Sequence, residues 1–444
     1  MHLTPRWFLI VATLTVLGSP SRLDASLAEF VAKPDPSYRW ATGPSWQDGE
    51  VMFTSLRITS QTFQGTAWQH VLTVAYPNTI DTTDHALLIV GGGRHDQLPE
   101  FGSPHGQTPA SRLATLHSLA THSHLIVATI EQVPFQPLFA GLTEDAIISH
   151  SINQFFRTGD HTWPVLQPMV KSVVRAMDTV QAHVEKTRGY RLRSFTVSGE
   201  SKRAWTSWLT AAIDPRVKAV VPLVFDMLNI PVQLQHQVAT WGRYSEELGD
   251  YDGLAQMLAS PPGQQLLEII DPFRLRSHLN QAKLMILATN DRYWPVDAAN
   301  FYFSDLPNPK YLYYVPNSGH ETNGRPEIEE DRIAMALAAA GKITLPEVNS
   351  TFHVDPTTGK GSLQFASTQT PLRLRVMRAT SKSLDFRSAL WTEWMSMSQR
   401  SKATVIIDAH KAQATAAYIE VTYHLNGHRF TVTSEVGIIP AKPN

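Results

Sequence analysis

The chain has 444 residues, a formal net charge of −1 and no cysteine. This length predicts one large domain with an appendage, or two domains. The near-neutral charge excludes the broad basic surface that nucleic acids and anionic membranes require, and the lack of cysteine excludes disulfides and a lipoprotein anchor.

The first 28 residues have the order of a secretory signal peptide. Arg6 precedes an apolar run over residues 7–17, and small residues follow, ending near Ala25 or Ala28. The apolar run is shorter than the roughly 20 residues of a membrane-spanning helix. We therefore predict that residues 1–28 are removed and that the mature protein is secreted or periplasmic, without stable membrane insertion.

Residues 51–77 alternate apolar and polar side chains, which predicts two antiparallel strands. Short apolar runs then predict strands buried on both faces. These runs lie at 85–90, 123–130, 195–198, 217–225, 283–289 and 311–316. Helical periodicity lies between several of them, most clearly over 170–184. The alternation predicts an α/β-hydrolase-like, mostly parallel sheet with helices on both faces, over residues 29–350.

Two segments depart from this alternation. Residues 229–279 are long and rich in Gln, Tyr and Trp, which predicts a lid or pocket-wall insertion. After a helix around 327–340, apolar and polar residues alternate again, and Asn426-Gly427 separates two such runs. An Asn-Gly pair in that setting is a strong hairpin signal. We predict a small β-sandwich-like domain over residues 351–444.

The stretch FTVSGESKRAW joins an expected strand to an expected helix through Gly199, Glu200 and Ser201. A sharp turn of this kind exposes a nucleophile above the sheet and leaves backbone N–H groups beside it. The motif for the turn is G-x-S-x-G, and Arg203 stands where the second glycine is expected. A serine that merely caps the helix is the alternative interpretation of so short a motif.

Residues further along the chain favour the catalytic interpretation. A serine hydroxyl needs a base to take its proton, and the base needs an acid to orient it. In this architecture the order along the chain is serine, acid, histidine. Asp291 follows one predicted strand and His320 follows the next. Asp226, which follows a neighbouring strand, is the alternative acid.

A run of glycines after the strand at 85–90 is expected to complete the site. Gly92 and Gly93, together with the backbone N–H of Lys202, are candidates to bind an oxyanion. Tyr293 and Trp294 stand beside the candidate acid and are candidate pocket-wall residues.

Charged residues surround the candidate nucleophile. Lys202 and Arg203 work against the helix dipole at this end of a helix, which suggests anion recognition or pairing with Glu200. Glu200 is itself a candidate substrate contact. His117, His122 and His124 lack a nearby carboxylate, so we predict no metal site, and we expect no cofactor.

Several stretches resemble the PhoPQ-activated pathogenicity-related proteins, a family of exported α/β-hydrolase-like proteins. They include SGESKRAWTSWLTAAIDPRVKAVVPLVFDMLN, ATNDRYWPVDAANFYF, YVPNSGHE and YIEVTYHLNGHRFTVTSEVGIIP. The resemblance covers nearly the whole mature chain and implies an exported hydrolase fold with a link to virulence or stress responses. Family members show Gly-Ala-Ser-Lys-Arg-Gly-Trp at the turn, so Glu200 replaces alanine and Ala204 replaces glycine.

Three functional hypotheses follow. The first is an exported serine hydrolase in which Ser201, His320 and Asp291 cleave an ester or amide bond of a small molecule or peptide. The second is a binding or signalling protein that keeps the scaffold without turnover. The third is an aminopeptidase in which Glu200 and the 229–279 insertion bind a peptide amino terminus. The sequence leaves the substrate and the oligomeric state open.

Overall fold

The computed structural model describes residues 24–98, 100, 102–103, 106–397, 399–410 and 412–441. Residues 1–23 of the predicted signal peptide lie outside the described residues. Its predicted end at residue 28 falls inside helix α1 (Asp24–Ala32), in which Leu27 and Val31 are buried. No helix in the described part of the chain is long and apolar enough to cross a membrane.

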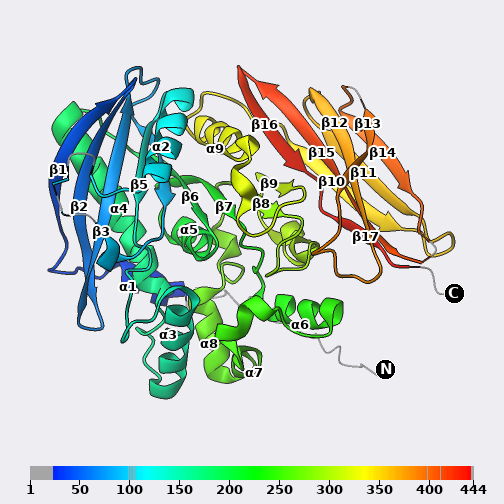
Figure 1. Ribbon diagram of the computed structural model, residues 1–444, viewed down its shortest axis with the longest axis horizontal. Coiled ribbons are helices and arrows are strands. Elements are labelled where there is room, and N and C mark those ends of the chain that lie inside the picture. The colour runs from blue at the N-terminus through cyan, green and yellow to red at the C-terminus, as the bar shows by residue number, and fades with distance from the viewer. Residues whose placement is uncertain are drawn as a thin grey trace, which may run out of the picture.

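A large mixed sheet runs through the molecule (Figure 1). Its strands are β1 (Arg39–Asp48), β2 (Val51–Phe63), β3 (Thr66–Pro77), β4 (His85–Val90), β5 (Ile126–Ile130), β6 (Ser194–Glu200), β7 (Val217–Leu223), β8 (Ala282–Ala288), β9 (Lys310–Val315), β12 (Arg373–Ser381), β13 (Thr392–Met397), β15 (Ala414–Leu425), β16 (His428–Thr433) and β17 (Gly437–Ile439). The order is β1-β2-β3-β5-β4-β6-β7-β8-β9-β16-β15-β12-β13, and β17 pairs with β15. The strands from β5 to β9 pair in parallel.

Helices cover both faces of the parallel strands because successive residues of a strand point to opposite sides. Leu87 of β4 belongs to a core shared with α2 (Ala110–Ser123) and α9 (Pro326–Ala339). The next residue, Leu88, belongs to a core shared with α1, α4 (Leu166–Arg188) and α5 (Lys202–Ile213). The predicted class, a mostly parallel sheet between two helical layers, is therefore confirmed.

The helical segment between β7 and β8 lies at the carboxyl ends of the parallel strands. It contains α6 (Ile230–Trp241), the 3-10 helix η2 (Glu246–Tyr251), α7 (Leu254–Leu258) and α8 (Pro261–Ile270). Helix α3 (Glu144–Thr158) reaches η2 from the other side. Together these elements form a cover over the end of the sheet at which Ser201 lies (Figure 1).

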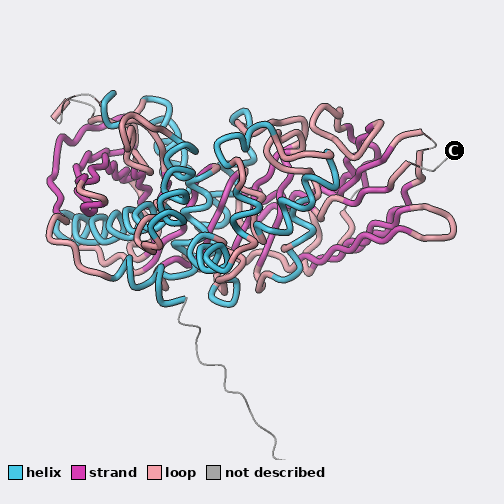
Figure 2. Tube along the Cα trace, turned by 90° about the horizontal axis from the view of Figure 1, so that it is seen from below, coloured by secondary structure: helices cyan, strands magenta, loops and turns pink. Residues whose placement is uncertain are grey.

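The C-terminal region is built of strands and loops (Figure 2). A second sheet contains β10 (Val348–Val354), β11 (Gly361–Ser367) and β14 (Lys402–Ile407). Its Leu363 and Val405 pack in one core with Val376 and Ile419 of the large sheet, which makes a two-layer sandwich. The large sheet is continuous because β16 pairs with β9, a feature that the sequence did not predict.

Candidate active site

Ser201 lies at the turn between β6 and α5, in a backbone conformation that side-chain-bearing residues rarely adopt. Its φ is 56° and its ψ is −124°, and its N–H donates to the carbonyl of Leu223 on β7 at 2.9 Å. A Cβ at Gly199 would lie 2.6 Å from the backbone oxygen of Arg203. Only glycine at this position lets helix α5 approach the strand so closely, and this approach fixes the strained turn.

The structure brings Ser201 together with both residues that the sequence paired with it. Ser201 Oγ lies 2.9 Å from His320 Nε2, and His320 Nδ1 lies 2.9 Å from Asp291 Oδ2. In the tautomer with the proton on Nδ1, His320 donates to Asp291 and accepts from Ser201. Asp291 also accepts the N–H of Tyr293 at 2.9 Å, and the Tyr293 ring packs against His320 in a tilted arrangement, with 4.3 Å between centroids. These contacts fix the imidazole between hydroxyl and carboxylate.

Asp226, the alternative acid, lies elsewhere. It is buried and accepts a hydrogen bond from Tyr302 Oη at 2.7 Å. Burial raises its pKa well above the ordinary value, and the charges of Asp291 and Asp297 add to the effect. The carboxylate that contacts His320 is that of Asp291, whereas Asp226 accepts its hydrogen bond from a tyrosine.

The glycine loop after β4 packs against the start of α5. Its backbone pairs with residues 130–133: the Gln132 N–H donates to the Gly92 carbonyl at 2.8 Å. A Cβ at Gly92 would lie 2.5 Å from Arg203 Nη2, so the guanidinium fills the space that the glycine leaves. Gly93 has a φ of 108°, which favours glycine. The loop thus lies beside the turn that carries Ser201, where the sequence expected it.

Arg203 and Lys202 pair with helix α3, which corrects the expected pairing with Glu200. Arg203 makes two hydrogen bonds to the Glu144 carboxylate, at 2.8 and 2.9 Å, and one to the carbonyl of Val133 at 2.6 Å. Lys202 Nζ lies 2.8 Å from the same carboxylate. Burial would raise the pKa of Glu144, but the two cations outweigh it and hold this pKa well below the ordinary value. Arg203, which replaces the motif's glycine, thus ties α5, α3 and the loop after β5 together.

Glu200 was expected to contact substrate. Its side chain instead faces helix α9, on one side of the sheet, where it pairs with Arg332. Its carboxylate accepts from Arg332 Nη2 of α9 at 2.9 Å. Ser198, two residues earlier on the same strand, accepts from Arg332 Nε at 3.1 Å. The period of two residues along β6 explains the error, because Glu200 and Ser201 cannot face the same way there. The aminopeptidase hypothesis required the Glu200 carboxylate to bind a peptide amino terminus, and this carboxylate is paired with Arg332 instead.

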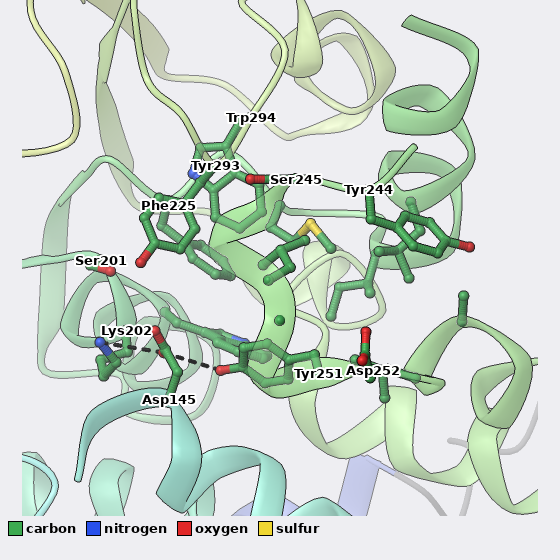
Figure 3. A pocket seen from close by; sticks show the side chains of 18 of the residues that line it. Asp145, Ser201, Lys202, Phe225, Tyr244, Ser245, Tyr251, Asp252, Tyr293 and Trp294 are labelled. Carbon is green, nitrogen blue, oxygen red and sulfur yellow. Dashed lines mark hydrogen bonds and ion pairs between the residues drawn. The ribbon is translucent and has the colours of Figure 1, made fainter. Parts of the chain in front are cut away.

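A cavity of about 250 Å³ opens at Ser201 (Figure 3). Its wall is mainly apolar and aromatic, and comes from α5, the end of β7, the segment between β7 and β8 and the loop after β8. It includes Trp205, Phe225, Leu234, Leu254, Ile270 and Trp294. Tyr293 also lines the cavity. Tyr293 and Trp294 are the two residues that the sequence predicted as pocket wall. Figure 3 shows Lys202, Asp145 and Tyr251 linked across one side: Lys202 Nζ lies 3.3 Å from Asp145, and Tyr251 donates to Asp145 at 3.1 Å.

The loops that carry Asp291 and His320 are held by a segment of the C-terminal region, residues 386–391. Asn290 Nδ2 donates to the carbonyl of Ala389 at 2.8 Å. Asn317 exchanges two hydrogen bonds with the backbone of Trp391, at 2.7 and 2.8 Å. Neither asparagine was predicted from the sequence. Their position close to the acid and the histidine was the available signal, but nothing local identifies a partner about 75 to 100 residues away.

Histidines outside this site have structural contacts. His95 stacks on Phe135 with ring centroids 4.1 Å apart and does not line the cavity. His122 makes a hydrogen bond with the carbonyl of Ser118 on its own helix at 2.8 Å. Among the described residues, no group of three or more His, Cys, Asp or Glu side chains could hold a metal ion.

The parallel sheet, the strained turn and the three hydrogen-bonded side chains together define a protein of the α/β-hydrolase fold, with esterases among its structural neighbours. The sequence pattern of the PhoPQ-activated pathogenicity-related proteins matches residues 27–387, and the chain belongs to this family.

Two known proteins illustrate the relationship. Autocrine proliferation repressor protein A of Dictyostelium discoideum is 30% identical over 331 residues, which are 71% of this chain and 65% of that protein. The chain therefore spans just under two thirds of that relative's length. Acetyl xylan esterase 1 from Thermoanaerobacterium sp. JW/SL YS485 is 17% identical, with a TM-score of 0.50 over 72% of this chain and 94% of the esterase. This similarity concerns the fold.

Proposed function

We propose that the protein is an exported serine hydrolase that cleaves an ester or amide bond through a covalent acyl-enzyme. One observation carries the proposal: Ser201 Oγ, His320 and Asp291 form an unbroken hydrogen-bonded chain with both distances at 2.9 Å. This hydrogen-bonded series ends at Ser201, which lines a cavity large enough to accept part of a substrate. A serine that only caps a helix needs neither the histidine nor the cavity.

The chemistry follows from this geometry. Ser201 Oγ attacks the carbonyl carbon of the substrate while His320 Nε2 takes the hydroxyl proton. Asp291 keeps His320 in the required tautomer and stabilises the imidazolium. We assign the stabilisation of the negative oxygen to the backbone N–H of Lys202 and to an N–H of the Gly92–Gly93 loop. His320 then protonates the leaving group, and a water molecule, activated by the same imidazole, releases the acyl group.

Labelling with a fluorophosphonate probe tests the proposal. The wild-type protein should be labelled at Ser201, and Ser201→Ala should reduce labelling to background, because no hydroxyl remains beside His320. Ser207→Ala is the matched control: it removes a hydroxyl from the same helix, one that donates to the Arg203 carbonyl. Labelling that persists in Ser201→Ala, or that never occurs in the wild type, would overturn the proposal.

A second candidate function is binding or signalling without turnover. It is supported by the name of the 30% identical relative, an autocrine proliferation repressor. The two candidates differ in one measurement. A biological effect that survives in a folded Ser201→Ala variant favours binding, whereas an effect lost with the hydroxyl favours hydrolysis.

A further inference from the structure

The residues that line the cavity at Ser201 favour the acyl side of the candidate nucleophile. Ser201 and Lys202 line it, whereas His320 does not. In serine hydrolysis the leaving group takes its proton from the histidine, so it must lie toward His320. The group that remains bonded to Ser201 then lies toward Lys202 and Trp205, inside the cavity.

The wall and size of the cavity suit an apolar chain. Trp205 stacks on Phe225 at 5.0 Å between centroids, and Leu234, Leu254 and Ile270 are buried around them. The volume of about 250 Å³ is roughly eight times the space of one water molecule in the liquid, about 30 Å³. This is room for an acyl chain of about four to eight carbons, or for one aromatic ring.

The charges of the cavity oppose an anionic substrate. Its lining contains three carboxyl groups, those of Asp145, Glu246 and Asp252, and one ammonium group, that of Lys202. Burial raises the pKa of Tyr293 to about 12, and the charges of Asp145 and Glu247 add to the effect. Glu246 is paired with Arg387 at 3.1 Å, and Lys202 is held by Asp145 and Glu144, so neither cation is free to receive a carboxylate.

We infer, on the basis of the proposed hydrolase function, that the substrate carries an uncharged, apolar acyl group of medium length that enters this cavity. Short acyl groups leave the wall unfilled and long ones exceed the cavity. A terminal carboxylate would lie among acidic side chains whose cationic partners, Lys202 and Arg387, are already paired.

A series of p-nitrophenyl esters tests the inference. The value of kcat/KM should rise about fifteenfold from acetate to butyrate, since each of the two added methylenes contributes about fourfold when it is buried, and should fall again at palmitate. The hemisuccinate, close in size to butyrate but anionic, should react at least tenfold more slowly than butyrate. Ala255→Trp narrows the cavity and should move the optimum to acetate. Gln256→Trp adds the same side chain at the next, exposed position of α7, outside the cavity lining, and should leave the profile unchanged.

Binding to Ser201→Ala separates this inference from the proposed function. Trp205 and Trp294 line the cavity, so tryptophan fluorescence should report binding of octanamide at least tenfold tighter than of octanoate. A labelled enzyme that prefers acetate, accepts hemisuccinate as well as butyrate, or improves through palmitate would overturn the inference and leave the hydrolase proposal intact. Equal binding of octanamide and octanoate would overturn the inference even if the wild type proved inactive.

Discussion

The α/β region and the C-terminal β region contribute to the candidate site in different ways. The residues that line the cavity lie between positions 145 and 294, all in the α/β region. The C-terminal region supplies backbone instead: the 386–391 segment holds Asn290 and Asn317, next to the acid and the histidine. The same segment reaches the cavity wall through Arg387, which pairs with Glu246 and stacks on Trp241. One region therefore provides reactive groups, and the other restrains them.

The largest expected effect is on kcat, and it distinguishes the two candidate acids of the α/β region, Asp291 and Asp226. Asp291→Asn should lower kcat by about 10³- to 10⁴-fold, because an amide in place of the acceptor favours the wrong tautomer of His320. Asp226→Asn should change kcat less than about threefold, because its side-chain oxygen accepts from Tyr302 and it is Asp291 that contacts His320. Steady-state kinetics on one ester gives both values. Equal losses would show that the acid has been misassigned.

The next effect tests the restraint from the C-terminal region. Asn317→Ala removes both hydrogen bonds to Trp391 and should lower kcat by about 10- to 100-fold with little change in KM, because small displacements of reacting groups are costly. Asn280→Ala is the control, since its side chain bonds only to the nearby Ser277 carbonyl. A loss of thermal stability with kcat unchanged would mean that the segment supports the fold and not the site.

The smallest expected effect concerns the free energy of unfolding and not catalysis. It comes from a buried histidine in the sheet of the α/β region. His85 is buried on β4, with its ring nitrogens 2.8 Å from Ser194 Oγ and 3.0 Å from Thr196 Oγ1. Burial lowers its pKa to about 4, whereas in the unfolded chain the imidazole titrates near pH 6.5. The unfolded state therefore binds more protons between these values, and the free energy of unfolding falls as pH falls through this window.

The contribution of His85 to this fall is about 2 kcal/mol between pH 7 and pH 5. The variant His85→Gln keeps a polar side chain without an ionisable ring, so it should lose about that much less stability over the same interval. Denaturant unfolding at both pH values measures the difference. A pH dependence that does not change in the variant would show that other groups dominate acid unfolding.

Much of the fold was predictable because its signals are local. Buried apolar runs gave the parallel strands, and Asn426-Gly427 gave the β15–β16 hairpin. Strand β1 was missed because it is an edge strand with largely exposed side chains and contains Gly43 and Pro44. The pairing of β16 with β9 has no sequence signal at all, since it joins residues 312 and 433.

The candidate site was predictable where chain order constrains geometry. The positions of Ser201, Asp291 and His320 follow from the rule that parallel strands present their carboxyl ends at one edge. Side-chain direction was harder to infer. Glu200 was misplaced because it stands next to Ser201 in sequence but faces α9, and the pairing of Arg203 with Glu144 depends on how α3 packs.

The burial of Leu27 bears on the predicted position of signal-peptide cleavage. Helix α1 packs on α4, and Leu27 is 1% exposed there. Cleavage after Ala28 would delete this side chain and leave a void beneath α4, at a cost of about 2 to 5 kcal/mol for a buried leucine. If the predicted leader is removed, a cut upstream of residue 27 keeps this buried leucine in helix α1.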